Sequence, residues 1–209
     1  MKQTRNGLLL VVSGPAGVGK GTVDSALLSR NSGIRMSVSA TTRAPRPGEI
    51  DGVHYFFKSE DEFKRMIEEN AFLEYMHVFH MNYYGTPRSF VEEELASGRD
   101  VILDIDEQGG MKVKEAYPDA VLIFIVPPSM SELKSRLIGR HTETPEAIET
   151  RFATAFAELD CASKYDYIVV NDVLDMAVSR MESIIAAETC RPARNAAFLT
   201  KLKGGNLPL

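Results

Sequence analysis

The chain has 209 residues, of which 44% are hydrophobic and 25% charged, the composition of an ordinary globular protein. Its net charge of −5 argues against a nucleic-acid partner, and its apolar runs are too short to span a membrane. Cys161 and Cys190 lack the spacing of a metal or redox motif, so we expect a cytoplasmic protein with inert thiols. A homo-oligomer is compatible with the sequence, which leaves the oligomeric state open.

The first predicted strand, Leu8–Val12, is followed by a glycine-rich loop and by a helical segment over Val23–Arg30. The loop reads Gly14-Pro15-Ala16-Gly17-Val18-Gly19-Lys20-Gly21-Thr22. This order is typical of a triphosphate-binding loop, in which backbone N–H groups and the lysine contact the phosphates. A glycine-rich turn without a ligand is the alternative, and the agreement of strand, glycine spacing and lysine argues against it.

Gly21 stands where the usual pattern has a serine or threonine whose hydroxyl contacts Mg²⁺. We therefore expect Mg²⁺ to be held less directly, through water, by Thr22 and by Asp104. The loop predicts a triphosphate site, but it specifies neither the acceptor nor the reaction.

Residues 35–97 predict a small α+β insertion. Met36–Thr42 and His54–Phe57 indicate short strands, and Ser59 begins a helix that has Phe63, Met66 and Ile67 on its inner face. Within the insertion, Arg43 and Arg46 are separated by Ala44-Pro45, and the proline stiffens the backbone between them. Two fixed guanidinium groups are suited to binding a phosphate, and Tyr55 and Tyr84 would add hydroxyl donors. The alternative is a solvated basic turn, or arginines paired with Glu49 and Asp51.

Residues 98–190 alternate strands and helices. The apolar runs Val101–Leu103, Val121–Val126 and Tyr167–Val170 predict buried strands, while helices are expected to begin at Ser129, at Thr144-Pro145 and near Leu174. The second helix has an apolar face made of Ile148, Phe152, Ala155, Phe156 and Leu159. The pattern predicts an α/β fold with a parallel sheet, flanking helices and ligands at the carboxyl ends of its strands.

We divide the chain into a phosphate-loop core (1–34 and 98–190), a lid at about 139–150, an insertion (35–97) and a tail (191–209). The glycines Gly204-Gly205 predict that the tail is loosely held.

Several short strings occur in an order that resembles bacterial-type guanylate kinases, from Leu8 to about Glu188. Besides the phosphate loop they are Ser37–Glu49, Phe72-Leu73-Glu74-Tyr75, Asn82-Tyr83-Tyr84-Gly85-Thr86, Leu103-Asp104-Ile105-Asp106-Glu107-Gln108-Gly109 and Ile168-Val169-Val170-Asn171-Asp172. The resemblance implies a P-loop NTPase-type sheet with a GMP-binding insertion and a short lid. It also implies transfer of the γ-phosphoryl group of ATP to GMP, with Mg²⁺ bound to ATP.

The resemblance further implies roles for individual residues. Residues 14–22 would bind ATP. Those that would contact GMP are Ser39, Arg43, Arg46, Glu49, Tyr55, Glu74, Tyr84, Thr86, Asp104 and Asp106. Lys20, Arg43, Arg136, Arg140 and Arg151 would be catalytic, the last three on the lid side. Glu74 would accept hydrogen bonds from guanine N1–H and the 2-amino group, which adenine cannot offer on that edge.

Some of these residues could instead have purely structural roles. Asp104 and Asp106 could cap the end of a strand, and the lid-side arginines could form surface ion pairs with Glu132 or Glu143. The sequence departs from the family pattern at Gly21, His141 and Val173, and the link Phe79-His80-Met81-Asn82 is one residue longer than usual.

Three other functions fit parts of the sequence. Asp106-Glu107-Gln108-Gly109 matches a GTPase switch pattern, but the chain has no N-K-x-D motif to read guanine. The Gly-Lys-Gly-Thr ending of the phosphate loop resembles that of adenylate kinases and would fit a nucleoside monophosphate kinase of another base specificity. Glu74 argues against this alternative. The third is a catalytically inactive guanylate-kinase-like module that binds proteins, and such modules typically lack the loop lysine.

Overall fold

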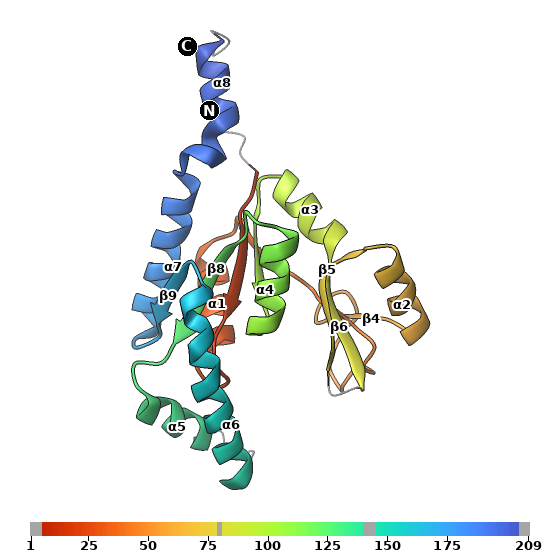
Figure 1. The fold of residues 1–209 in the computed structure, drawn as a ribbon, viewed down its shortest axis with the longest axis vertical. Helices are drawn as coiled ribbons and strands as arrows, with labels where there is room; N and C mark the ends of the chain where they lie inside the picture. The colour runs from red at the N-terminus through yellow and green to blue at the C-terminus, as the bar shows by residue number, and fades with distance from the viewer. Residues whose placement is uncertain (1–5, 79–80, 140–144, 205–209) are drawn as a thin grey trace.

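A computed structural model of the chain describes residues 6–78, 81–139 and 145–204, and its centre is a parallel five-stranded sheet. The strand order is β2 (Ile34–Met36), β7 (Asp100–Asp104), β1 (Leu9–Ser13), β8 (Val121–Val126) and β9 (Tyr167–Val170). The five strands are parallel, and Figure 1 shows that their carboxyl ends all point toward the end of the molecule from which α5, α6 and a second, smaller sheet project. The predicted α/β fold is therefore confirmed.

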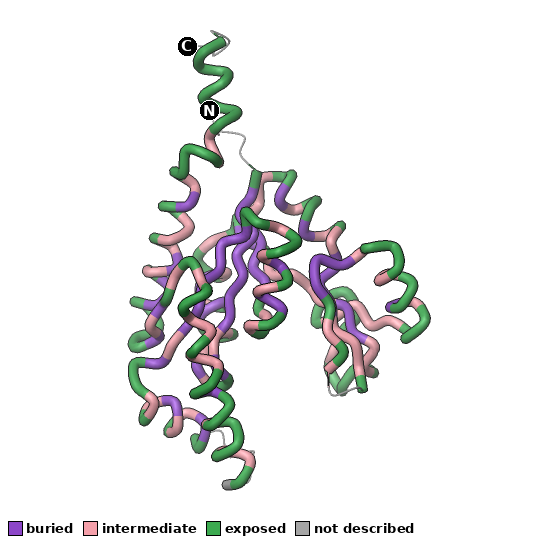
Figure 2. The backbone as a smooth tube through the Cα atoms, viewed as in Figure 1, coloured by how far each residue is buried: buried purple, intermediate pink, exposed green. Residues whose placement is uncertain are grey.

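The three central strands of the large sheet, β7, β1 and β8, are buried on both faces because their apolar side chains alternate between two cores. Leu8, Leu10 and Val12 pack with α1 (Lys20–Arg30) and α7 (Leu174–Thr189) on one face. Leu9 and Val11 pack with α3 (Arg88–Ala96) and α4 (Glu107–Ala116) on the other. The central strands are accordingly purple in Figure 2. The sheet thus fixes the loops at its carboxyl edge from both sides.

A second, four-stranded sheet forms most of the insertion. Its order is β4 (Phe56–Phe57), β3 (Ala40–Thr41), β6 (Asn82–Pro87) and β5 (Phe72–Val78). Helix α2 (Glu60–Glu68) covers it, and the predicted inner residues Phe63, Met66 and Ile67 form its small core with Phe72. The Ser59 capping box that begins α2 is present. Our boundary between residues 34 and 35 falls inside β2, which pairs with β7 of the large sheet.

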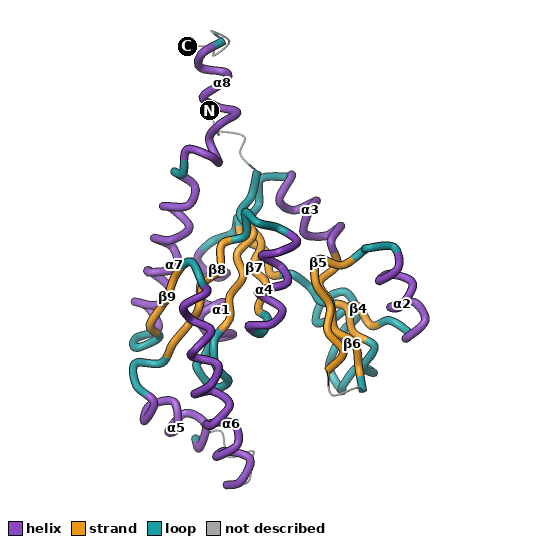
Figure 3. The backbone as a smooth tube through the Cα atoms, in the orientation of Figure 1, coloured by secondary structure: helices purple, strands orange, loops and turns teal. Residues whose placement is uncertain are grey.

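The lid side is formed by α5 (Met130–Ile138) and α6 (Pro145–Glu158), drawn at the lower left of Figure 3. Ser129 caps α5 by accepting a hydrogen bond from Glu132 N, and α6 begins at the predicted proline. One expectation for α6 is wrong, since the side chain of Phe156 is 63% exposed instead of lying on the buried face. A 3₁₀ helix, η1 (Leu159–Lys164), then leads to β9.

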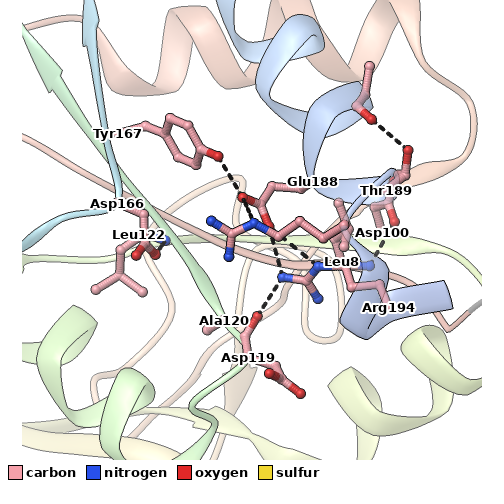
Figure 4. Close-up of polar contacts among 12 residues, drawn as sticks. Leu8, Asp100, Asp119, Ala120, Leu122, Asp166, Tyr167, Glu188, Thr189 and Arg194 are labelled. Atoms are coloured by element: carbon pink, nitrogen blue, oxygen red, sulfur yellow. Dashed lines mark hydrogen bonds and ion pairs between the residues drawn. The ribbon is translucent and has the colours of Figure 1, made fainter. Parts of the chain in front are cut away.

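The tail contains two helical elements, η2 (Pro192–Asn195) and α8 (Ala196–Lys203), which follow α7. Figure 4 shows what holds its start to the amino ends of the strands. Glu188 is 1% exposed and accepts the Tyr167 hydroxyl at 2.6 Å, while Arg194 donates to it at 3.1 Å and to Asp119 O at 2.9 Å. Helix α8 itself extends away from the body (Figure 1).

Among the described residues, no helix is long and apolar enough to cross a membrane. The two cysteines are free thiols, Cys161 half-buried and Cys190 exposed. The network at the tail lies at the end of the large sheet opposite the glycine-rich loop.

Candidate active site

The loop between β1 and α1 has the backbone of an anion cradle. Gly17 and Gly19 have φ angles of 86° and 96°, a left-handed region that other residues rarely adopt. A Cβ on Gly19 would also lie 2.7 Å from Nδ2 of Asn171. Helix α1 begins after Gly19 without a side-chain cap, so its first N–H groups are open to a bound anion.

Lys20 lies at the start of α1 between the loop and the end of β7. Its ammonium donates to Gly14 O at 3.1 Å and lies 3.6 Å from a carboxylate oxygen of Asp104. These groups border a cavity of about 360 Å³ lined by Pro15, Ala16, Gly17, Gly19, Lys20, Gly21, Thr22 and Asp104. Burial raises the pKa of Asp104, while Lys20 lowers it. The cavity therefore combines backbone donors, one cation and one carboxylate.

Two residues from outside the loop brace it through Val18, whose side chain is buried. Arg136 donates to Val18 O at 3.2 Å and to Asn171 O at 3.1 Å, and its Nε also contacts Glu132 at 3.0 Å. The amide of Asn171 donates to the same Val18 oxygen at 2.8 Å. Arg136 thus forms the Glu132 pair that the sequence offered as an alternative, but it contacts the phosphate loop as well.

A second pocket, of about 290 Å³, lies between the second sheet and the end of β7. It is lined by Ser39, Tyr55, Glu74, Met76, Val78, Tyr84, Gly85, Asp104, Ile105, Asp106 and Gly109. A neighbouring hollow adds Thr86 beside Ser39, Tyr55 and Asp104. Asp104 lines this pocket, its neighbour and the phosphate-loop cavity, so the three spaces meet at one carboxylate.

Glu74 is the acidic group on the wall that β5 contributes to this pocket. Its side chain is 8% exposed, and its Oε1 accepts the hydroxyl of the fully buried Thr86 at 2.8 Å. Burial raises the pKa of Glu74 and nearby Asp106 adds to the rise, whereas the bond from Thr86 opposes it. Lys112 on α4 donates to Tyr75 O at 2.9 Å, which ties the β5 wall to the large sheet's side of the pocket.

Arg43 is held by Glu49 in a bidentate pair. Its two terminal nitrogens donate to the two carboxylate oxygens at 2.9 and 2.8 Å, and Glu49 also accepts Arg46 N at 2.7 Å. The bonds from Arg43 and Arg46 lower the pKa of Glu49 to about 2. The Arg43 guanidinium lies 5.3 Å from the centre of the Tyr55 ring. The arginine–Glu49 pairing that the sequence offered as an alternative is thus present.

Other predicted site residues occupy three kinds of position. Asp106 is the N-cap of α4 and accepts Gly109 N at 2.8 Å, so the capping role weighed from the sequence is real, although Asp106 also lines the pocket. The Arg46 and Arg151 side chains are exposed on the insertion and on α6. Arg140 and His141, with residues 79–80 of the long link, lie outside the described residues.

Comparisons with known proteins agree with this geometry. A family model described as guanylate kinase matches residues 6–188. A guanylate kinase of Caldanaerobacter subterraneus is 53% identical over 203 residues, covering 97% of this chain and 98% of the relative. One from Symbiobacterium thermophilum is 52% identical and covers 99% of both chains.

The chain belongs to the guanylate kinase family. It is an enzyme that phosphorylates GMP to GDP with ATP. The crystal structure of guanylate kinase from Anaplasma phagocytophilum is similar, with a TM-score of 0.72 and 35% identity over 91% of this chain and 90% of that one. The predicted family and activity are thereby confirmed.

Sequence reasoning gave no role to three side chains of this guanylate kinase. Asn171 braces the loop, yet nothing in its sequence position points to Val18, which is 153 residues away. Glu158, near the end of α6, accepts a hydrogen bond from Ala16 of the loop. Asp24 is fully buried in α1, and an acid four residues after the loop lysine on a helix was a visible signal.

The donor set at the phosphate loop fits Mg²⁺ in part. Asp104 and Thr22 offer hard oxygen atoms beside Lys20, the ligand type that Mg²⁺ prefers. In the described ranges, no group of three His, Cys, Asp or Glu side chains could hold a metal ion by itself. An ion here would need phosphate oxygens and water for the rest of its coordination shell.

Proposed function

We propose that the enzyme binds the ATP triphosphate at residues 14–22 and GMP in the pocket of the second sheet, so that the reacting phosphates meet beside Asp104. The observation that carries this arrangement is that Asp104 lines the cavities on both sides. The carboxyl ends of parallel strands are where α/β proteins bind their ligands. We also propose the division into core, insertion, lid and tail given above, and a cytoplasmic location for the enzyme.

The pocket chemistry supports reading of guanine by Glu74. A carboxylate accepts two hydrogen bonds side by side, which matches N1–H and the 2-amino group of guanine. Because Thr86 already donates to Oε1, the Glu74 side chain has a fixed orientation before the base arrives. Ser39, which also lines this pocket, would contact the base near O6.

The GMP phosphate would then face Arg43, Arg46, Tyr55 and Tyr84. Arg43 is oriented by Glu49 and packs on Tyr55, so its fork is formed before substrate binds. Tyr55 and Tyr84 lie edge to face with ring centres 6.0 Å apart and supply hydroxyl donors. Glu49, which we expected to contact GMP, contributes through Arg43.

The acceptor oxygen of GMP is already anionic, so the reaction needs no strong general base. The chain's contribution is to align the two phosphates, neutralise their charge and exclude water. Lys20 and the open N–H groups of α1 would face the transferring phosphoryl group, and Arg136, Arg140 and Arg151 would close from the lid side. Mg²⁺, when bound with ATP, supplies charge neutralisation, and Thr22 and Asp104 would hold its water shell.

A coupled assay of ADP release, with ATP against GMP, AMP, CMP and UMP, tests the proposed division of the pockets. We expect turnover with GMP and little with the other three, because only guanine offers two donors to Glu74. The Lys20→Ala protein, purified in parallel, controls for contaminating kinases. Equal turnover with AMP and GMP would contradict the assignment of the guanine pocket.

A further inference from the structure

The pocket that we assign to GMP has β5 as one wall, and β5 is the last strand of its sheet and lies beside helix α4 of the core. An edge strand has backbone groups without a strand partner on its outer side. Lys112 of α4 reaches one backbone oxygen of this strand, since its Nζ donates to Tyr75 O at 2.9 Å. The same ammonium lies 5.8 Å from the centre of the Tyr75 ring, within the range of a cation–π contact. One lysine of the core therefore holds β5 by both a carbonyl and a side chain.

This contact lies next to Glu74, which directly precedes Tyr75 in the chain. On the other side of Glu74, Leu73 is buried in the same hydrophobic core as Val113 of α4. Glu74 is thus flanked by two attachments of β5 to α4, one apolar and one made by Lys112. Because removal of the lysine leaves the apolar attachment, we expect β5 to stay in place while the orientation of Glu74 becomes looser.

The first turn of α4 comes close to the Glu74 carboxylate itself. A Cβ built on Gly109 would lie 3.5 Å from Glu74 Oε2. Gly109 and Lys112 are three residues apart, so they share one face of the helix. Thr86 binds the other oxygen, Oε1. A small displacement of β5 from α4 would therefore change the space around the oxygen that Thr86 leaves free.

Lys112 also offsets the acidic surroundings of Glu74. Burial is the main effect that raises the pKa of Glu74, and Asp106, the N-cap of α4, adds to the rise. Lys112 lowers that pKa and so favours the ionised carboxylate, the form that accepts two donors. The other ionisable side chains that line the pocket come from the end of β7 and from the insertion: Asp104, Tyr55 and Tyr84.

We propose that Lys112 is a positioning residue for guanine recognition: it holds β5 against α4 and so keeps Glu74 oriented, and ionised, for the base. The inference rests on the proposed reading of guanine by Glu74. In this scheme Lys112 touches neither nucleotide, so its effect should appear in GMP binding and not in the chemical step. Because Lys112 acts through Glu74, its contribution should disappear when Glu74 no longer offers a carboxylate.

A double-mutant cycle on the full chain tests this dependence. GMP affinity is measured by calorimetry, and kcat and the KM for ATP by ADP release, for Lys112→Met, Glu74→Gln and the doubly substituted protein. We expect Lys112→Met to weaken GMP binding about fivefold, the loss that corresponds to one hydrogen bond of ordinary strength, with kcat and the KM for ATP unchanged. In the Glu74→Gln background the same substitution should change GMP affinity by less than about twofold.

Two further variants separate positioning from a general loss of charge. Lys112→Arg keeps a cationic donor that can reach Tyr75 O and should retain GMP affinity to within about twofold. Lys114→Met removes another lysine of α4, which donates to Ala120 O at 2.6 Å and to Asp166 at 3.1 Å, and should leave GMP affinity unchanged. Thermal unfolding checks that each protein folds.

The pH dependence of GMP affinity is a readout that a merely structural role would not move. GMP binding should weaken as pH falls through the folded-state pKa of Glu74, because protonation removes an acceptor. Loss of the Lys112 charge raises that pKa, so in Lys112→Met the weakening should begin at a higher pH than in the unmodified protein. Lys112→Arg should keep the original profile.

Unchanged GMP affinity in Lys112→Met would overturn the inference, and so would a pH profile that does not shift. An equal loss of affinity in both backgrounds would also overturn it, since Lys112 would then act independently of Glu74. If Glu74→Gln itself left GMP affinity unchanged, the proposed reading of guanine would fail instead.

Discussion

Replacing Glu74 with glutamine should cost this guanylate kinase most of its affinity for GMP while leaving ATP unaffected. The amide keeps the size of the side chain but offers one acceptor where the carboxylate offers two. Because Thr86 already donates to Oε1 at 2.8 Å, the side chain has little freedom to move toward the base. At least one guanine donor then loses its charged partner inside a pocket where the Glu74 side chain is only 8% exposed.

The magnitude follows from that single lost contact. A hydrogen bond to a charged group is worth about 1.5–3 kcal/mol. Since each 1.4 kcal/mol is about a factor of ten, the KM for GMP should rise about 10- to 150-fold. The same substitution should raise turnover with AMP relative to GMP, because an amide can donate to N1 of adenine and accept from its amino group.

The pH dependence of Glu74 gives an independent readout. Burial raises its pKa in the folded protein, so folding favours the protonated form. Its contribution to the unfolding free energy is therefore full below the ordinary glutamate pKa and is lost as pH rises through the raised folded-state value. The affinity for GMP should depend on pH in the opposite direction, since only the ionised form of Glu74 accepts two donors. The KM for GMP should therefore rise as pH falls through the folded-state pKa of Glu74.

The assay is steady-state ADP release with GMP varied at saturating ATP, then the reverse, repeated from mildly acidic to mildly alkaline pH. Thermal unfolding of the Glu74→Gln protein checks that it folds. An unchanged KM for GMP would refute the reading of guanine by Glu74. Equal increases in KM for both nucleotides would indicate a distorted fold instead.

The other predictions are tested by similar measurements. Lys20→Ala should lower kcat about 100- to 1000-fold, as loss of a transition-state contact does, while calorimetric GMP affinity stays unchanged; lost GMP binding with kcat retained would contradict its placement on the ATP side. Arg43→Lys should raise the KM for GMP about tenfold because lysine cannot form the bidentate contact; an unchanged KM would remove Arg43 from the phosphate site. Glu188→Ala removes the buried acceptor of Tyr167, Arg191 and Arg194 and should lower the unfolding free energy in urea by about 1.5–3 kcal/mol with kcat unchanged (Figure 4). A loss below about 1 kcal/mol would mean that the network behaves as an exposed ion pair.

The fold was predictable wherever local sequence patterns determine burial. The apolar runs Val121–Val126 and Tyr167–Val170 coincide with β8 and β9. A strand covered on both faces, such as β8, needs apolar residues throughout. The expected burial of Tyr167–Val170 is wrong, however, because β9 is an edge strand on which Ile168 is 57% exposed. β2 was missed as part of the large sheet because it has only three residues, of which Ile34 alone is buried. Its pairing with β7 depends on contacts about 66 residues away in sequence.

Phe156 shows where helical periodicity misleads. Its position fits the apolar face of α6, yet α6 meets the body along Ile148, Phe152 and Ala155, which are buried or partly buried against the main core. Periodicity indicates which side chains share a face, but the width of the covered stripe depends on what packs against the helix. The contact partners of a lid helix cannot be derived from its own sequence.

The candidate site likewise has parts that the sequence predicts and parts that it does not. Residues of the phosphate loop are contiguous, so the sequence predicts their geometry through the glycine φ angles and the order of strand and helix. Glu74 and Thr86 are predicted only through the family resemblance, since their 2.8 Å contact depends on the register of β5 against β6 and on a shift between Phe72 and Glu74. Asp24 could have been noticed, but its lack of partners is a property of the packed structure.

The two proposed phosphate sites share one electrostatic device. Each presents a basic side chain already next to an acid: Lys20 beside Asp104 at 3.6 Å, and Arg43 on Glu49 at 2.8 Å. Such pairs hold the cation in place and keep the empty cleft from accumulating positive charge. A phosphate that binds Lys20 frees Asp104 for the water shell of Mg²⁺, whereas a phosphate on Arg43 can use donors that Glu49 leaves free. The two acids therefore differ in role. In the proposed scheme, Asp104 would exchange its partner during the reaction cycle, while Glu49 would keep Arg43 oriented throughout.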